Sequence, residues 1–68
     1  MRVRVNGSDA ELDSGTTAAD IVQRYGADAS GRGVAVAING EVIARGMWDN
    51  IELGEGDRVE VLGAIGGG

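Results

Sequence analysis

The sequence has no cysteine, no histidine and no lysine among its 68 residues. Without cysteine, no disulfide can hold the fold together, and no thiolate can bind a metal or act as a nucleophile. Without histidine, the chain lacks the side chain that most often transfers protons near neutral pH. Carboxylates, arginines, hydroxyls and the chain ends remain for chemistry. The composition therefore predicts a protein that is not an enzyme and that has neither a metal site nor a bound cofactor of its own.

Long apolar runs and concentrated positive charge are missing as well. No run approaches the roughly 20 apolar residues of a membrane helix, and no apolar segment that would indicate a signal peptide follows Arg2 and Arg4. We therefore expect a soluble, cytoplasmic protein that does not bind membranes. The net charge is −5, and the six arginines are scattered along the sequence, so nucleic-acid binding is not expected. Asp9, Glu11 and Asp13 lack the ligand number and the glycine of a calcium loop.

Two Asn-Gly pairs, Asn6-Gly7 and Asn39-Gly40, each follow a segment in which apolar residues alternate with polar or small ones. Such pairs favour the type I′ turn of a two-residue β-hairpin, because both residues tolerate positive φ. A further alternating segment, preceded by the turn residues Gly56-Asp57, lies near the end of the sequence. The pattern predicts strands at residues 1–5, 9–13, 34–38, 41–43 and 58–62.

One helix is expected between the two hairpins. Thr17 followed by Asp20 is typical of a capping box, and Gly26 stands where a helix commonly ends. Residues 27–33 are predicted to form a loop. Residues 45–50 are expected to be irregular and to carry Trp48, which we interpret as a lid over a small core.

This order of elements predicts an α+β protein with a β-grasp fold, in which a mixed five-stranded sheet packs on one main helix. The last strand is expected to lie beside the first. We expect a domain at residues 1–63 and a flexible, glycine-rich C-terminal tail at residues 64–68. The predicted core consists of apolar residues from every element: Val3, Val5, Leu12, Ile21, Val22, Tyr25, Val34, Val36, Ile38, Val42, Leu53, Val59 and Val61.

The glycine run Gly66-Gly67-Gly68 is the least ordinary feature of the sequence. Glycine is costly to order and adds nothing to a core. A frayed terminus is one interpretation, because loose chain ends are common. The other is that the tail enters a narrow channel of a partner, which only residues without side chains can do. The terminal carboxylate of Gly68 would then be the reactive group, and an enzyme would have to activate it.

Residues 34–68 resemble the ThiS family, the sulfur carriers of the thiamin pathway. This family belongs to a superfamily of ubiquitin-like sulfur carriers, which also includes the carriers of the molybdopterin pathway. The resemblance is carried by Asn39-Gly40, the return through Val42, Arg45 and Trp48, the Gly56-Asp57 turn, Val59, Val61 and the terminal glycines; the N-terminal half matches more loosely. Ala44 departs from the pattern, because a proline is common there, and Gly66 adds a third glycine.

The resemblance implies a cycle of partners. An adenylating enzyme similar to ThiF and MoeB would activate Gly68 with ATP, and a cysteine desulfurase or another sulfur donor would supply sulfur. The product would be a C-terminal thiocarboxylate, which thiazole synthase would consume. A related carrier for molybdopterin, tRNA thiolation or a specialised metabolite is the first alternative, and a ubiquitin-like interaction module with an inert tail is the second.

A docking surface for these partners is expected around Leu62, because this residue alternates with Val59 and Val61 and so faces away from the core. An exposed apolar patch on a small protein commonly marks an interaction site. Arg45 and Trp48 are alternative contacts for the adenylating enzyme. The expected docking residues are Leu62, Ile65, Met47, Ala35 and Ala37.

Overall fold

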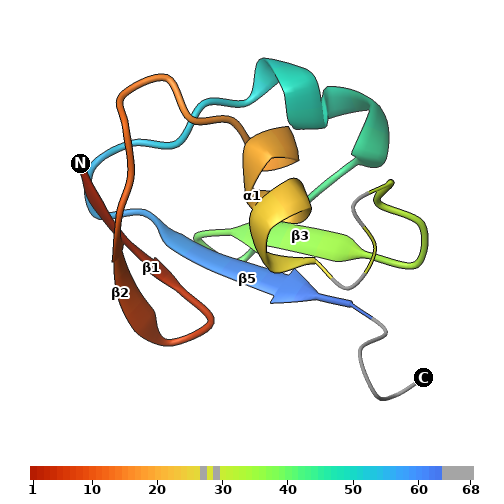
Figure 1. Ribbon diagram of the computed structural model, residues 1–68, viewed down its shortest axis with the longest axis horizontal. Coiled ribbons are helices and arrows are strands. Elements are labelled where there is room, and N and C mark those ends of the chain that lie inside the picture. Colours follow the sequence, from red (N-terminus) through yellow and green to blue (C-terminus); the bar gives the residue numbers. More distant parts are fainter. Residues whose placement is uncertain (27, 29, 64–68) are drawn as a thin grey trace.

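The computed structural model describes residues 1–26, 28 and 30–63 (Figure 1). Its elements follow the predicted order of a hairpin, a helix, a second hairpin and a last strand. They are β1 (Arg2–Val5), β2 (Ser8–Glu11), α1 (Ala18–Tyr25), β3 (Ala35–Ile38), β4 (Glu41–Ile43), the 3₁₀ helix η1 (Arg45–Asn50) and β5 (Arg58–Leu62).

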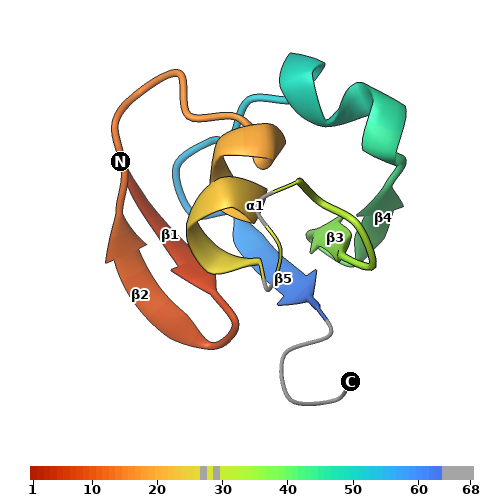
Figure 2. The ribbon, with the colours of Figure 1, turned by 45° about the vertical axis from the view of Figure 1, so that its right-hand side comes forward.

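The five strands form one sheet in the order β2-β1-β5-β3-β4, which Figure 2 shows from left to right. The neighbours β1 and β5 run parallel, whereas the other three pairs are antiparallel. Helix α1 packs on one face of this sheet and also contacts η1. The predicted β-grasp with a mixed five-stranded sheet is therefore confirmed, as is the position of the last strand beside the first.

Both hairpin turns have the backbone that their sequences predict. Asn6 and Gly7 have φ values of 51° and 84°, and Asn39 and Gly40 have values of 52° and 85°. The second strand ends earlier than expected, at Glu11 rather than at residue 13.

Helix α1 begins with the predicted capping box. The Thr17 hydroxyl accepts a hydrogen bond from the Asp20 amide at 3.2 Å, and the Asp20 carboxylate accepts one from the Thr17 amide at 3.0 Å. Gly26 ends the helix, but with φ at −76° rather than in the left-handed region. Its lack of a side chain matters for another reason: a Cβ atom there would lie 2.6 Å from the Val22 carbonyl oxygen.

The core lies between the sheet and the two helices, and most of the predicted core residues are buried in it. Tyr25, Val34 and Ile38 are only partly buried. Val42 was predicted wrongly, because it is 74% exposed. In the hairpin register Val42 lies opposite Ala37, so it faces away from the core, and Ile43 packs inward in its place.

The segment expected to be irregular is the 3₁₀ helix η1, and the predicted role of Trp48 as a lid is confirmed. Trp48 is 6% exposed, and its indole Nε1–H donates to the Ile43 carbonyl at 3.0 Å. Buried Gly31 lies against the indole, because a Cβ atom there would be 2.6 Å from Trp48 Cζ3. The loop before β3 therefore fits closely under the lid.

Candidate functional site

The glycine tail follows β5, so this strand determines where the tail leaves the domain. Gly63 is the last residue that the structure describes (Figure 1). The predicted reactive residue Gly68, the tail residues Gly66 and Gly67, and the docking residue Ile65 all lie outside the described residues.

Leu62 occupies the exit of the tail and is 67% exposed, as its alternation with Val59 and Val61 predicts. It faces the side of the sheet opposite α1, which we call the outer face. Ala35 lies directly across from Leu62 on β3, and Ala37 lies across from Val42 on β4. These four residues, Ala35, Ala37, Val42 and Leu62, form what we call the apolar patch.

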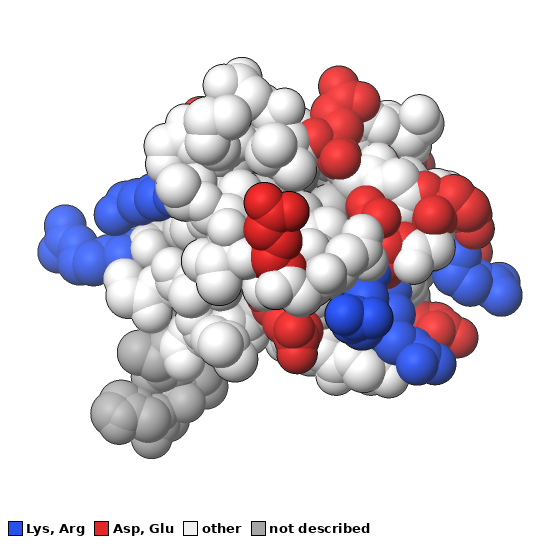
Figure 3. Space-filling view, turned by 180° about the vertical axis from the view of Figure 1, so that it is seen from behind, with Lys and Arg blue, Asp and Glu red and all other residues white. Residues whose placement is uncertain are grey.

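The outer face is divided between two kinds of surface. Figure 3 shows basic and acidic side chains interspersed over the β1–β2 half, and a whiter surface over the β3–β4 half, where the apolar patch lies. Glu60 lies on β5 at the border between the two halves, because it is in register with Ala37 of the apolar patch. The patch thus adjoins the exit of the tail and borders charged residues on one side.

Met47 lies elsewhere. It is 47% exposed, but it belongs to η1, which packs against α1. The structure therefore brings Leu62, Ala35 and Ala37 together and leaves Met47 outside the apolar patch. Val42 takes a place in this patch that the sequence analysis had given to the core.

Arg45 anchors the loop before β3. Its Nη2 donates to the Ser30 carbonyl at 2.7 Å. Hydrogen bonds from the backbone amide and side chain of Ser30, together with the nearby Arg45 charge, lower the pKa of the Asp28 carboxyl below its ordinary value. These contacts position the loop beneath Trp48. The observed contact of Arg45 is therefore with a loop of its own chain.

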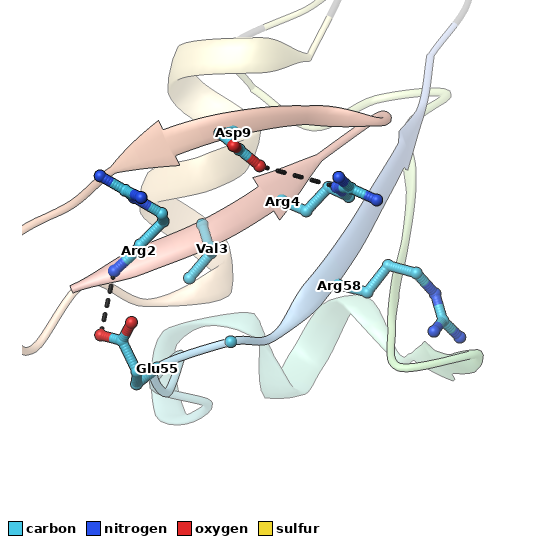
Figure 4. Close-up of a pocket in the computed structure, with 7 residues that line it drawn as sticks. Arg2, Val3, Arg4, Asp9, Glu55 and Arg58 are labelled. Carbon is cyan, nitrogen blue, oxygen red and sulfur yellow. Dashed lines mark hydrogen bonds and ion pairs between the residues drawn. The ribbon is translucent and has the colours of Figure 1, made fainter.

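Three of the arginines that are scattered in the sequence lie together in space. Arg2 and Arg4 face outward from β1, and Arg4 is in register with Arg58 on β5. A hollow of about 410 Å³ lies among them (Figure 4). We call Arg2, Arg4 and Arg58 the arginine cluster.

The ion pairs of this cluster differ in strength. Arg2 Nε lies 3.1 Å from the Glu11 carboxylate, and Arg4 Nε lies 3.7 Å from that of Asp9. For Arg58, no ion pair to another described residue is found. Figure 4 shows its guanidinium extending away from β1. The sequence analysis placed the last strand beside the first but missed this cluster, because it did not give the register that sets Arg4 beside Arg58, 54 positions further on.

Neither a metal site nor a membrane helix is found in the part of the chain that the structure describes. No three carboxylates there are grouped so that they could hold an ion. Neither helix in that part is long and apolar enough to cross a bilayer.

Comparison with known proteins identifies the family. The chain is similar to the crystal structure of thiamine biosynthesis protein ThiS from Geobacter metallireducens, with a TM-score of 0.77, 31% identity and full coverage of both chains. A solution structure of a thiamine biosynthesis protein from the same organism gives a TM-score of 0.73 at 30% identity, over 91% of this chain and 81% of that one.

Two curated relatives bear the name thiazole synthase. The one from Magnetococcus marinus is 34% identical over all 68 residues, and the one from Paramagnetospirillum magneticum is 28% identical over the same length. The chain spans only 20% of the length of each. The model of the ThiS family matches residues 3–68. With this match over nearly its whole length, the chain belongs to the ThiS family.

Proposed function

We propose that this chain is a sulfur carrier of thiamin biosynthesis and that the sulfur is carried on the carbonyl carbon of Gly68. The observation that supports this most strongly is the family match over residues 3–68, which includes the glycine run. The similarity to thiamine biosynthesis proteins over the whole chain agrees with it. The reactive group belongs to the backbone, so the chain needs no catalytic side chain.

Activation is the first chemical step. A carboxylate has an unperturbed pKa of about 3.3–3.7 at a chain end and is anionic at neutral pH, so it resists nucleophiles. Attack of its oxygen on the α-phosphorus of ATP forms an acyl adenylate and releases pyrophosphate. A sulfur nucleophile then attacks the carbonyl carbon and displaces AMP. Where the donor is a persulfide, this step forms an acyl disulfide, and a thiol reductant must supply the two electrons that cleave it to the thiocarboxylate and the donor thiol. An adenylating enzyme similar to ThiF and MoeB binds the ATP, and a cysteine desulfurase or another donor supplies the sulfur.

The contribution of the chain is to present the tail. Strand β5 is fixed between β1 and β3, so the start of the tail is held by the middle of the sheet. Fully extended, residues 63–68 would reach about 20 Å at roughly 3.3–3.6 Å per residue. Gly66, Gly67 and Gly68 add no side chains that would clash in a channel. The activated carbonyl can thus react inside an enzyme while the folded domain stays outside.

Thiazole synthase is the partner that we propose for the transfer of sulfur. Two proteins of that name contain a segment similar to this whole chain, which supports a functional link between a domain of this kind and that activity. The apolar patch beside the exit of the tail is the proposed docking surface, with Leu62 at its centre and Ile65 beyond it. Met47 is exposed on η1, which packs against α1. A partner docked on the apolar patch would contact Met47 only if it also extended to η1.

Changing the end of the chain tests the proposal. Removing Gly68, or adding one residue after it, should abolish ATP–pyrophosphate exchange with the adenylating enzyme of the same source and leave the circular dichroism spectrum unchanged. Intact mass spectrometry should detect the replacement of one oxygen by sulfur in the unaltered chain only. Exchange at the normal rate by the shortened chain would contradict the proposal.

A second stage of the same experiment identifies the acceptor. The thiocarboxylated chain, mixed with thiazole synthase from the same source, should lose its sulfur to the thiazole product. If it is inert there but is discharged by an enzyme that thiolates tRNA, molybdopterin or another metabolite, the thiamin assignment is wrong. If no thiocarboxylate ever forms, the chain is an interaction module.

A further inference from the structure

The arginine cluster is not used by the chemistry proposed above. It lies on the outer face of β1 and β5, and its member Arg58 is on the same strand as Leu62. The net charge of the protein is −5. Half of the six arginines gather there, in and around a hollow of about 410 Å³ (Figure 4). Like charges side by side on neighbouring strands repel each other. Because Arg4 and Arg58 are in register, a nearby negative charge would reduce the repulsion between them.

The chain supplies such negative charge unevenly. Arg2 is well paired with Glu11, and Arg4 is loosely paired with Asp9 at 3.7 Å. Arg58 is exposed, and no ion pair joins it to another described residue. Its Nη2 lies over the Asn39-Gly40 turn, 3.7 Å from where a Cβ of Gly40 would be. No described residue accepts a hydrogen bond from its guanidinium, so its five N–H donors can meet an external acceptor.

We propose that Arg58, with Arg4 beside it, binds carboxylate side chains of the adenylating enzyme when the tail enters that enzyme. This inference rests on the proposed function and names a second point of contact for it. Arg58 and Leu62 share one face of β5 and are four residues apart, which is about 13 Å at roughly 3.3 Å per residue. A protein that covers Leu62 thus reaches Arg58 within an interface of ordinary size.

The chemistry of the cluster favours a protein carboxylate over a phosphate. Asp9 and Glu55 also line the hollow, and their charges would repel the several negative charges of a nucleotide or nucleic acid. A single carboxylate can pair with the planar guanidinium of Arg58 through two parallel hydrogen bonds. It can do so at the rim without displacing the existing ion pairs of Arg2 and Arg4.

The adenylating enzyme, rather than the sulfur acceptor, is the partner that needs this contact. It meets the chain before activation, when the tail ends in glycines and an ordinary carboxylate. Such a tail differs little from the C-terminus of other proteins. The adenylating enzyme must therefore recognise the folded domain. The acceptor, which is proposed to dock on the apolar patch, also meets a thiocarboxylate, a group that the chain lacks before activation.

The test compares Arg58→Glu with Arg24→Glu in the full chain. Arg24 lies on α1, on the other side of the sheet, so both variants change the net charge equally. With the adenylating enzyme of the same source, Arg58→Glu should raise the KM for the carrier by about tenfold and leave kcat unchanged, because rim charges act mainly on association. Arg24→Glu should stay within about twofold of the unaltered chain by the same reasoning. The difference should shrink between about 0.05 and 0.5 M salt, since screening weakens exposed ion pairs.

A calorimetric measurement of binding to the enzyme separates this proposal from the proposed function. If the unaltered chain binds and Arg58→Glu binds about tenfold more weakly than Arg24→Glu, the docking contact is supported even if no pyrophosphate exchange occurs. Equal effects of the two variants on KM and on the dissociation constant would overturn it. So would a loss confined to discharge by thiazole synthase, since the contact would then belong to the other partner.

Discussion

Replacing Gly31 by alanine tests how the tryptophan lid is seated on the core. Gly31 has φ at +84°, a conformation that residues with a side chain rarely adopt. A Cβ atom there would lie 2.6 Å from Trp48 Cζ3 and 3.3 Å from Cη2. The indole has little freedom to move away, because it is buried and its Nε1–H is bonded to the Ile43 carbonyl. Alanine therefore adds backbone strain and a steric clash.

Both contributions can be estimated. The left-handed backbone costs about 1–2 kcal/mol for a residue with a Cβ, and overpacking of a close contact costs about 1–3 kcal/mol. Together they predict that Gly31→Ala lowers the free energy of unfolding by roughly 2–5 kcal/mol. A domain of this length has roughly 3–10 kcal/mol in all, at about 0.05–0.15 kcal/mol per residue. The variant should thus lose a large part of its stability.

Gly33 provides the matched control. It also has a positive φ, at 74°, but a Cβ atom there would have no neighbour within 4 Å. Gly33→Ala should therefore cost only the strain of about 1–2 kcal/mol. Urea unfolding followed by the fluorescence of Trp48, the only tryptophan, measures both variants. Equal losses in the two variants would show that the indole yields without cost and would refute the reasoning.

Two further predictions concern the tail and its exit. Leu62→Asp should raise the KM for adenylation while changing the free energy of unfolding by only about 0.5 kcal/mol, because the side chain is 67% exposed; a large loss of stability in urea would place Leu62 in the core after all. Gly67→Val should fold normally and lose ATP–pyrophosphate exchange, since a β-branched side chain cannot enter a narrow channel. Normal exchange by that variant would mean that the tail is not threaded into the enzyme.

The parts of the fold that local chemistry determines could be predicted from the sequence. The Asn-Gly pairs specify their turns through backbone conformation, and Thr17 with Asp20 specifies a helix start through two reciprocal hydrogen bonds. In each case the deciding interactions lie within a few residues. The exposure of Leu62 followed from the same kind of local alternation in β5.

Val42 shows a prediction that failed although the sequence contained the information to correct it. A two-residue turn at Asn39-Gly40 fixes the register, so that Val42 must oppose Ala37. Because directly opposed residues share a face, Val42 belongs with the small alanines and not with the core. Hydrophobicity alone favoured the core, and the geometry of the turn decides otherwise.

The contacts that sequence reasoning could not supply are those between distant segments. Gly31 looks like any loop glycine until Trp48 is placed 17 positions further on and lies against it. Arg4 and Arg58 are far apart in the sequence and adjacent in the sheet. Neither contact has a local signature, because each depends on which elements the fold brings together.

Hydrogen bonds between distant segments also fix the position of β5, after which the tail begins. The start of the tail depends on β5, and β5 is fixed by hydrogen bonds to β1 on one side and β3 on the other. The Asn6 side chain adds a bond across this junction, because its Oδ1 accepts from the Val61 amide at 2.8 Å. The first hairpin turn thereby contacts the last strand directly before Leu62. The proposed function requires the tail to enter an adenylating enzyme and then a sulfur acceptor. A fixed exit serves both steps, since the distance from the proposed docking surface to the reactive carbonyl then depends on the tail alone.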